Sequence, residues 1–178
     1  MLATLFKKPG RFTGGIKLPE RKSLSNGDEL RIAPVPENLI HPLGQHIGKA
    51  AKPCVAVGER VLKGQTIAVG DGLISADVHA ASSGTVTAIE PRPIAHSSGL
   101  LAPCIAVDCD GVDESAEPQP HGADYLALSG DELRSRVRAA GIVGMGGAAF
   151  PAAVKLNSRG RAIDTLILNG AECESYIT

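Results

Sequence analysis

Short runs in which hydrophobic and polar residues alternate occur between residues 54 and 109. Five such runs are predicted strands, at residues 54–57, 65–69, 73–76, 85–89 and 104–109. The breaks between the first four hold Gly58, Gly64, Gly72 and Gly84, the residue type that tight turns favour. Short alternating strands joined by glycine turns are typical of a small antiparallel barrel or sandwich, which we predict over residues 40–107.

The pattern changes on either side of this block. Residues 1–39 are predicted to form an extended N-terminal segment. Residues 108–124 are acidic, contain Pro118 and Pro120 and hold few apolar side chains, which predicts a linker. Residues 125–178 are predicted to begin an α/β domain, because a helical pattern is followed by a glycine loop, a second helix and a short strand at 165–168.

The first of these helices has clear end signals. Ser129-Gly130-Asp131-Glu132 forms a capping box, and Leu133, Val137 and Ala140 follow at helical spacing. Gly141 stands where a C-terminal stop is expected. The glycine-rich loop therefore comes directly after a helix and not after a strand.

That loop is a candidate phosphate cradle. Gly144, Gly146 and Gly147 let backbone N–H groups approach an anion closely, because glycine has no Cβ. Pro151 is expected at the first position of the next helix, whose positive end then faces the same place, and Lys155 adds charge one turn later. A tight corner between packed helices is the structural alternative for the same glycines.

Two standard nucleotide motifs do not describe this loop. Residues 144–149 satisfy G-x-G-x-x-A, but the dinucleotide fingerprint needs a strand immediately before it. No Gly-Lys-Ser or Gly-Lys-Thr occurs in the chain, which excludes a Walker A loop.

The loop and the residues after it resemble a known site. Gly-x-Gly-Gly-x-x-Phe-Pro-x-x-x-Lys, the strand at 165–168 and the run Asn169-Gly170-Ala171-Glu172-Cys173-Glu174 are similar to the FMN- and NADH-binding loop of two families. One is the flavoprotein subunit of respiratory complex I, and the other is the C subunit of Rnf-type ion-translocating electron transport complexes. The runs at 12–16, 42–48 and 83–86 resemble only the second, which is the closer match over nearly the whole chain.

The resemblance implies roles for particular residues. Gly144, Gly146, Gly147 and Lys155 would hold the FMN phosphate, and Phe150 would pack near the rings. Asn169 and Glu172 would contact the flavin or its ribityl chain, and Glu174 would lie closer to the nicotinamide nucleotide. It implies no catalytic side chain and no metal ligand in this chain.

The resemblance also implies a place in an electron path. NADH would reduce FMN, and electrons would pass to [4Fe-4S] clusters, then to a membrane complex of the NAD:ferredoxin type that moves ions. Such clusters need C-x-x-C-x-x-C-x-x-x-C-P runs, which this chain lacks. We therefore expect an N-terminal fragment, inactive by itself, of a peripheral subunit on the cytoplasmic face of the membrane, with the other subunits of the complex as partners.

Two other interpretations compete with this one. The family pattern usually has glycine at Ala149, threonine at Ala152 and proline at Ser175, so the loop is alternatively a degenerate remnant in a docking module. The complex I flavoprotein itself is the other alternative, and the N-terminal barrel argues against it. The spacing around residues 57–65 and 83–86 resembles the barrel-sandwich hybrid of biotinyl and lipoyl carriers, and we expect that all-β fold for residues 40–107 in a chain of mixed α+β class. No lysine lies between Lys63 and Lys155 to carry a cofactor, so the hybrid is expected as a module without an attached group.

Composition and residue spacing argue against several other functions, among them nucleic-acid binding and metal binding. A net charge of −1 and 3% aromatic residues argue against a nucleic-acid groove, and no run of eighteen apolar residues is present to span a membrane. The cysteines show no C-x-x-C pair, and Cys104 and Cys109 are expected as ordinary residues of one strand. The five histidines form no metal motif and are expected in turns and at the surface: His41, His46, His79, His96 and His121.

Overall fold

The computed structural model describes residues 19, 21–24, 26–117, 125–145, 147–165 and 167–168. The chain divides into two compact units, one of Met1–Ile32 with Ile167–Thr178 and one of Ala33–Leu166. Among the described residues of the first unit, Lys22–Leu24 form a 3-10 turn, η1. The elements discussed below belong to the second unit.

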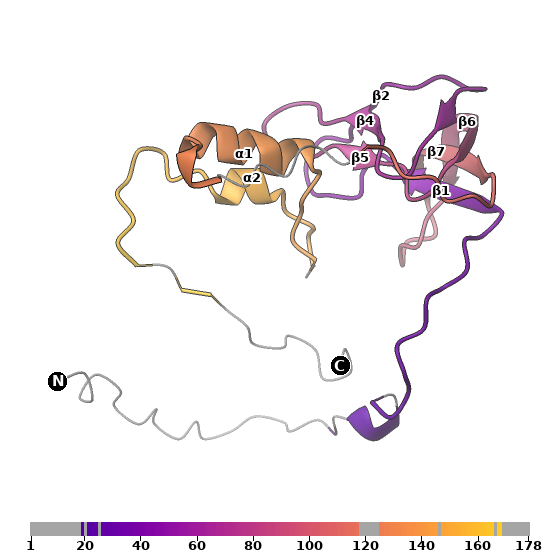
Figure 1. Ribbon diagram of the computed structural model, residues 1–178, viewed down its shortest axis with the longest axis horizontal. Helices are drawn as coiled ribbons and strands as arrows, with labels where there is room; N and C mark the ends of the chain where they lie inside the picture. The colour runs from indigo at the N-terminus through magenta and orange to yellow at the C-terminus, as the bar shows by residue number, and fades with distance from the viewer. Residues whose placement is uncertain are drawn as a thin grey trace. The chain divides into compact units, whose positions relative to one another are not determined.

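Two antiparallel sheets form the barrel (Figure 1). The larger sheet has the order β1-β7-β6-β3, and the smaller has the order β2-β4-β5. Antiparallel pairing confirms the predicted small β-barrel or sandwich. The strands are β1 (Asn38–Pro42), β2 (Lys52–Pro53), β3 (Arg60–Val61), β4 (Thr66–Val69), β5 (Val78–His79), β6 (Gly84–Pro93) and β7 (Leu101–Cys109).

Alternating side chains from both sheets fill the barrel interior. Val86 on β6 and Val107 on β7 are completely buried and lie opposite each other in register, and Ile67 on β4 is buried from the other sheet. Removing such side chains from water contributes about 1.5–3 kcal/mol each and holds the short strands together. The buried cluster consists of Leu43, Ala51, Val61, Ile67, Ala68, Val78, Ala80, Val86, Ile105 and Val107.

Three predicted strands appear where they were expected, and two do not. The runs at 65–69, 85–89 and 104–109 fall in β4, β6 and β7. The runs at 54–57 and 73–76 are wrong predictions, since these residues join no strand. At 73–76 side-chain bonds replace ladder bonds, because the Ser75 hydroxyl accepts from the Asp71 N–H at 3.0 Å and donates to the Lys49 carbonyl at 2.8 Å.

The chain leaving β7 folds back against the barrel. We call residues 110–116 the acidic strap. Its backbone pairs with Lys63, whose N–H donates to the Glu114 carbonyl and whose carbonyl accepts from the Ala116 N–H, both at 2.9 Å. The first part of the segment predicted to be a linker is thus attached to the barrel, while the division of the chain at residue 108 stays a prediction.

Charged groups reinforce the acidic strap. Arg60 contacts Asp110 at 3.1 Å and Glu114 at 2.6 Å, and Lys63 contacts Asp113 at 2.6 Å. The buried hydroxyls of Ser82 and Ser83 each donate to a strap carboxylate at 2.7 Å, to Asp113 and Asp110 respectively. These bonds to the charged forms lower the pKa of both carboxyl groups.

Two histidines expected at the surface are buried instead. His41 on β1 is 4% exposed, and its Nε2 accepts from the Ala81 N–H at 3.0 Å. Burial lowers the pKa of His41. His46 is 8% exposed, and its Nε2 accepts from the Ala76 N–H at 3.2 Å. Both rings are structural acceptors for backbone amides, which a search for histidine motifs does not detect.

The helical region follows the sequence pattern closely at its start. After η2 (Tyr125–Ala127), α1 spans Gly130–Ala139, and Ser129 and Glu132 form the predicted capping box. α2 is one turn, Ala152–Lys155, and lies beside α1 (Figure 1). Pro151 occupies the N-cap position and not the first helical position as predicted, because its ψ of 122° is extended.

The strand predicted at 165–168 is not present in the described part of that segment. Thr165, Ile167 and Leu168 have no strand assignment and pair with no described strand. A strand exists through hydrogen bonds to a neighbour, so an apolar run alone does not produce one. Within the described ranges, no helix has both the length and the apolar character that crossing a membrane requires.

Candidate functional site

The glycine loop connects α1 to α2 and is closed at its base by backbone pairing. Val143 and Pro151 form an isolated antiparallel bridge. The Gly144 N–H donates to the Phe150 carbonyl at 2.9 Å, and the Ala152 N–H donates to the Ile142 carbonyl at 2.9 Å. The loop is therefore a hairpin closed at its base by these contacts.

Lys155 folds back over this hairpin. Its Nζ lies 5.9 Å from the centroid of the Phe150 ring. A Cβ built on Gly144 would lie only 2.9 Å from the same Nζ, a distance that real Cβ contacts almost never show. The absence of a side chain at Gly144 thus makes room for the ammonium group, and the two residues predicted to share a site are brought together.

This arrangement fits an anionic group, with one difference from the expected cradle. The Lys155 cation lies beside Gly144, in a loop whose Gly147 has φ +78° and open space around its Cβ position. The Gly144 N–H is bonded within the loop, so it binds a phosphate oxygen only after leaving Phe150. Because α2 is a single turn, its dipole adds little, and Lys155 supplies most of the positive charge.

Four predicted site residues lie outside the described residues: Gly146, Asn169, Glu172 and Glu174. Their roles stay predictions. Ala149, where the family pattern has glycine, has φ +47°, the left-handed conformation that glycine adopts without strain.

A hollow of about 590 Å³ lies against the tip of the glycine loop. This volume is within the range of about 300–1,000 Å³ typical of ligand sites. One side of the hollow is Gly147, Ala148 and Ala149, and the barrel supplies the rest from two loops, 42–47 and 94–96. No motif in the sequence assigned these barrel loops a part in the site, although the run 42–48 helped to carry the family resemblance.

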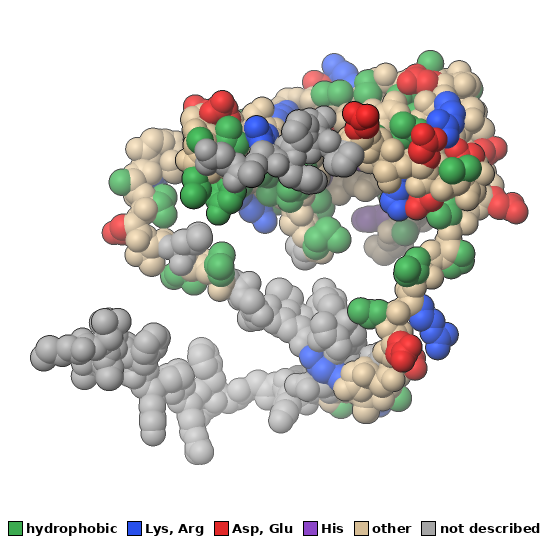
Figure 2. Space-filling model, in the orientation of Figure 1, with side chains coloured by type: hydrophobic (Ala, Val, Ile, Leu, Met, Phe, Trp, Pro, Cys, Tyr) green, Lys and Arg blue, Asp and Glu red, His purple; other side chains and the backbone are tan. Residues whose placement is uncertain are grey.

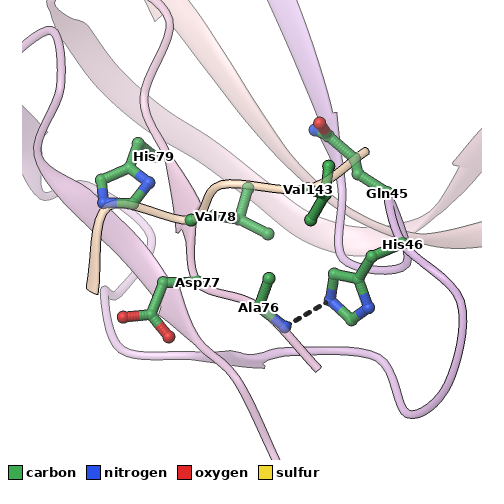
Figure 3. Close-up of a pocket in the computed structure, with 8 residues that line it drawn as sticks. Gln45, His46, Ala76, Asp77, Val78, His79 and Val143 are labelled. Carbon is green, nitrogen blue, oxygen red and sulfur yellow. Dashed lines mark hydrogen bonds between the residues drawn. The ribbon is translucent and has the colours of Figure 1, made fainter. Parts of the chain in front are cut away.

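A smaller cavity of about 220 Å³ also borders the 42–47 loop (Figure 3). Gln45 and His46 line both spaces. The Asp77 carboxylate accepts from the Gly70 N–H at 2.8 Å, so it is already paired. Figure 3 shows the His46 ring directed at the Ala76 amide, so His46 joins the 42–47 loop to the segment just before β5.

Gly141, just beyond the end of α1, lines this smaller cavity. A Cβ on Gly141 would lie 2.5 Å from the Asp77 carbonyl oxygen and 3.0 Å from the His79 ring, and Gly141 has φ +63°. The Arg138 guanidinium donates to the Gly72 carbonyl at 2.6 Å. Only glycine permits this approach, so α1 and the glycine loop are anchored to the barrel.

Cys104 and Cys109 are residues of one strand, as predicted. Cys104 and Cys109 both belong to β7, where an odd spacing of five puts their side chains on opposite faces. Burial raises the pKa of both thiols. In the described ranges, no three His, Cys, Asp or Glu side chains come together as a metal site.

Charge on the barrel surface is mixed. Figure 2 shows acidic and basic side chains interspersed on the face in view, in keeping with the ion pairs of the acidic strap. The positive charge at Lys155 is therefore a local feature of the loop.

Fold and site together define a class of protein: a barrel-sandwich hybrid domain followed by the first part of an FMN-binding domain. Residues 10–112 match the RnfC barrel sandwich hybrid domain, and residues 137–178 match the Nuo51 FMN-binding domain. The chain belongs to the RnfC family, the C subunits of ion-translocating oxidoreductase complexes.

Two curated relatives are each named as the C subunit of an ion-translocating oxidoreductase complex. The relative from Pseudomonas aeruginosa is 51% identical over 168 residues, which cover 94% of this chain and 22% of that protein. The relative from Serratia proteamaculans is 50% identical over 167 residues, covering 94% of this chain and 24% of that protein. The chain therefore spans about a quarter or less of the length of these relatives.

Proposed function

We propose that this chain is the part of an electron-transfer subunit that begins an FMN and NADH site, in a membrane-associated ion-translocating complex of the NAD:ferredoxin type. The observation that carries the proposal is the Lys155 ammonium held over Gly144, in a segment that matches an FMN-binding domain. The names of the two relatives support the assignment of the chain to a subunit of such a complex.

In this proposal Lys155 and the loop amides of Gly144, Gly146 and Gly147 hold the FMN phosphate. A hydrogen bond to a charged group contributes about 1.5–3 kcal/mol, so a few of them support micromolar binding. Phe150, Asn169 and Glu172 contact the flavin, and Glu174 contacts the nicotinamide nucleotide. Bound FMN would supply the chemistry that links hydride transfer from NADH to single-electron transfer.

The rest of the proposal concerns the whole protein. Its [4Fe-4S] clusters lie outside this chain, and its partners are the other subunits of the complex. It sits peripherally on the cytoplasmic face of the membrane. Residues 1–178 by themselves bind the cofactors incompletely and are inactive.

A docking module with a degenerate glycine loop is the second candidate. The closed hairpin favours it, because the Gly144 N–H is already paired with Phe150 and Ala149 holds a strained conformation. In that case the barrel binds other subunits, and the loop serves only to join α1 to α2.

Replacing Lys155 with methionine in the full-length protein separates these candidates. Lys155→Met keeps the length of the side chain and removes its charge, so FMN binding should weaken by about tenfold to a hundredfold. Fluorescence quenching of FMN measures the dissociation constant. Lys52→Met is the control, since Lys49 also pairs with Asp71 and compensates for the lost charge. No FMN binding by the unaltered protein, or equal affinity in Lys155→Met, favours the docking module.

A further inference from the structure

The barrel forms a wall of the hollow at the glycine loop. The Ile47 N–H on the barrel donates to the Ala148 carbonyl on the glycine loop at 3.1 Å, which fixes the two loops against each other. The hollow is an open depression whose two sides are held together by this bond. Any ligand held by the loop tip also meets the barrel.

The barrel side of the hollow is mostly apolar. Pro42, Ile47, Ile94 and Ala95 supply aliphatic surface. Apolar walls with a few polar groups are typical of sites for flat organic rings. The phosphate charge is expected at Lys155, so the apolar wall suits the opposite, uncharged end of a flavin.

Among the polar side chains of this wall, Gln45 is the most available. His46 is committed, because its Nε2 accepts from Ala76 and its Nδ1 lies 3.2 Å from the Ile47 carbonyl. The Nδ1 of His96 is paired with Ser98 at 2.8 Å. Gln45 is exposed, and its amide forms no hydrogen bond with any described residue.

The Gln45 side chain borders both cavities. In Figure 3 no hydrogen bond joins its amide to the other residues drawn, so the amide is free to serve the larger hollow. A primary amide offers donors and an acceptor side by side. The imide edge of a flavin ring, an N–H between two carbonyl groups, presents the complementary pattern.

We propose that Gln45, on the barrel, binds the ring of the flavin by hydrogen bonds to its imide edge, while the ring packs on the wall formed by Ile47, Ile94 and Ala95. This inference rests on the proposed function and extends it. The barrel then acts as a part of the cofactor site and not only as a docking module.

Two ligands separate the ring end of the site from its phosphate end. FMN and riboflavin share the ring, and riboflavin lacks the phosphate. In the full-length protein, Gln45→Leu removes the hydrogen bonds at nearly constant volume, and binding of both ligands should weaken by about tenfold. Lys155→Met should weaken the binding of FMN and leave the dissociation constant of riboflavin within about twofold of that of the unaltered protein. Fluorescence quenching measures all four dissociation constants.

Asn38→Leu is the matched control, because it removes an exposed amide from the far end of β1, outside both cavities. Equal affinity of Gln45→Leu and the unaltered protein for both ligands overturns the inference and leaves the proposed function standing. Failure of the unaltered protein to bind FMN overturns both the inference about Gln45 and the proposed function.

Ala95→Trp provides a second test if Gln45→Leu does not fold. Ala95 is exposed, so an indole there is tolerated by the barrel and fills the hollow. Binding of FMN and riboflavin should then both weaken at least tenfold, with an unchanged melting temperature. Unchanged binding by this variant overturns the inference.

Discussion

Ala149 shows at the scale of one residue how the loop departs from an ideal cradle. Its φ of +47° places an alanine in the left-handed region, which costs about 1–2 kcal/mol for a residue with a Cβ. The family resemblance marked this position as unusual, because glycine is the common residue there. The sequence thus identified the residue, and the backbone angle supplies the physical reason.

Ala149→Gly should therefore stabilise the protein. The strain energy removed from the folded state exceeds the free energy lost because glycine makes the unfolded chain more flexible. We therefore expect the free energy of unfolding to rise by about 0.5–1 kcal/mol. Ala148→Gly is the control, since Ala148 does not have a positive φ, and it should lower the free energy by about 0.5–1 kcal/mol. Urea denaturation measures both. If Ala149→Gly destabilises as much as Ala148→Gly, the strain is absent.

Lys155 and Gly144 illustrate the limit of sequence reasoning about single residues. Both were predicted to serve one anion, from residue type and spacing alone. Their contact depends on the hairpin that brings residue 144 back toward residue 155, and that hairpin is closed by the Val143–Pro151 bridge. No local pattern specifies such a bridge.

At the scale of elements, α1 is the clearest agreement between sequence and structure. Ser129 Oγ accepts from the Glu132 N–H at 3.3 Å, and the Glu132 carboxylate accepts from the Ser129 N–H at 2.8 Å. A capping box works through contacts only three residues apart, which is why sequence alone predicts it.

Ser129→Ala should destabilise α1 by about 1 kcal/mol, because the Glu132 N–H in its first turn loses its side-chain acceptor. Hydrogen exchange of the α1 amides should accelerate by about fivefold. Ser135→Ala makes the same chemical change inside the exposed part of α1 and should slow exchange slightly, since alanine has the higher helix propensity. Equal acceleration in both variants would refute the capping role.

The acidic strap gives the barrel a pH-dependent element. The Lys63 ammonium and the Ser82 hydroxyl lower the pKa of Asp113 by stabilising its charged form. Its contribution is therefore complete above the unfolded pKa of about 3.9 and is lost as the pH falls through the lower folded value.

Asp113→Asn should reduce the acid sensitivity of the fold. Asparagine tolerates the positive φ of 55° at this position, so the change chiefly removes the charge. The melting temperature should be lower than that of the unaltered protein at pH 7 and should fall less between pH 7 and pH 3. Asp164→Asn, at a residue without ion pairs among the described residues, should retain the full pH dependence. If the melting temperature of Asp113→Asn falls as much between pH 7 and pH 3 as that of the unaltered protein, Asp113 in the acidic strap is not a source of acid sensitivity.

The β elements were predicted less completely than α1. β4, β6 and β7 were recognised from their apolar residues, although burial alternates only at the start of β6 and residues 104–107 of β7 are all buried. The 73–76 run has the same composition, yet Ser75 bonds to the backbone at Lys49 and Asp71 and takes the chain out of the sheet. Competing side-chain bonds of this kind depend on residues distant in sequence.

At the scale of the whole second unit, Gly141 governs how α1 meets the barrel. A side chain there would overlap the Asp77 carbonyl and the His79 ring. Gly160 has a similar φ, +76°, but nothing lies within 4 Å of its Cβ position. The two glycines thus share a backbone requirement and differ only in their surroundings.

Gly141→Ala should lower the free energy of unfolding by at least about 2 kcal/mol, from backbone strain and overlap together. Gly160→Ala should cost only about 1 kcal/mol, from strain alone. Urea denaturation compares them, and hydrogen exchange of α1 should accelerate only in Gly141→Ala. Similar losses in both variants would show that α1 does not depend on this close approach.

The sequence by itself determined the features that local chemistry controls: the antiparallel barrel, the capped helix, the glycine loop with its lysine and the family. These depend on alternation, capping and spacing within a few residues. Tertiary structure decided the burial of His41 and His46, the attachment of the acidic strap and the barrel wall beside the glycine loop. Such features join residues about thirty to a hundred positions apart, and their energies arise from burial and pairing that only the folded chain creates.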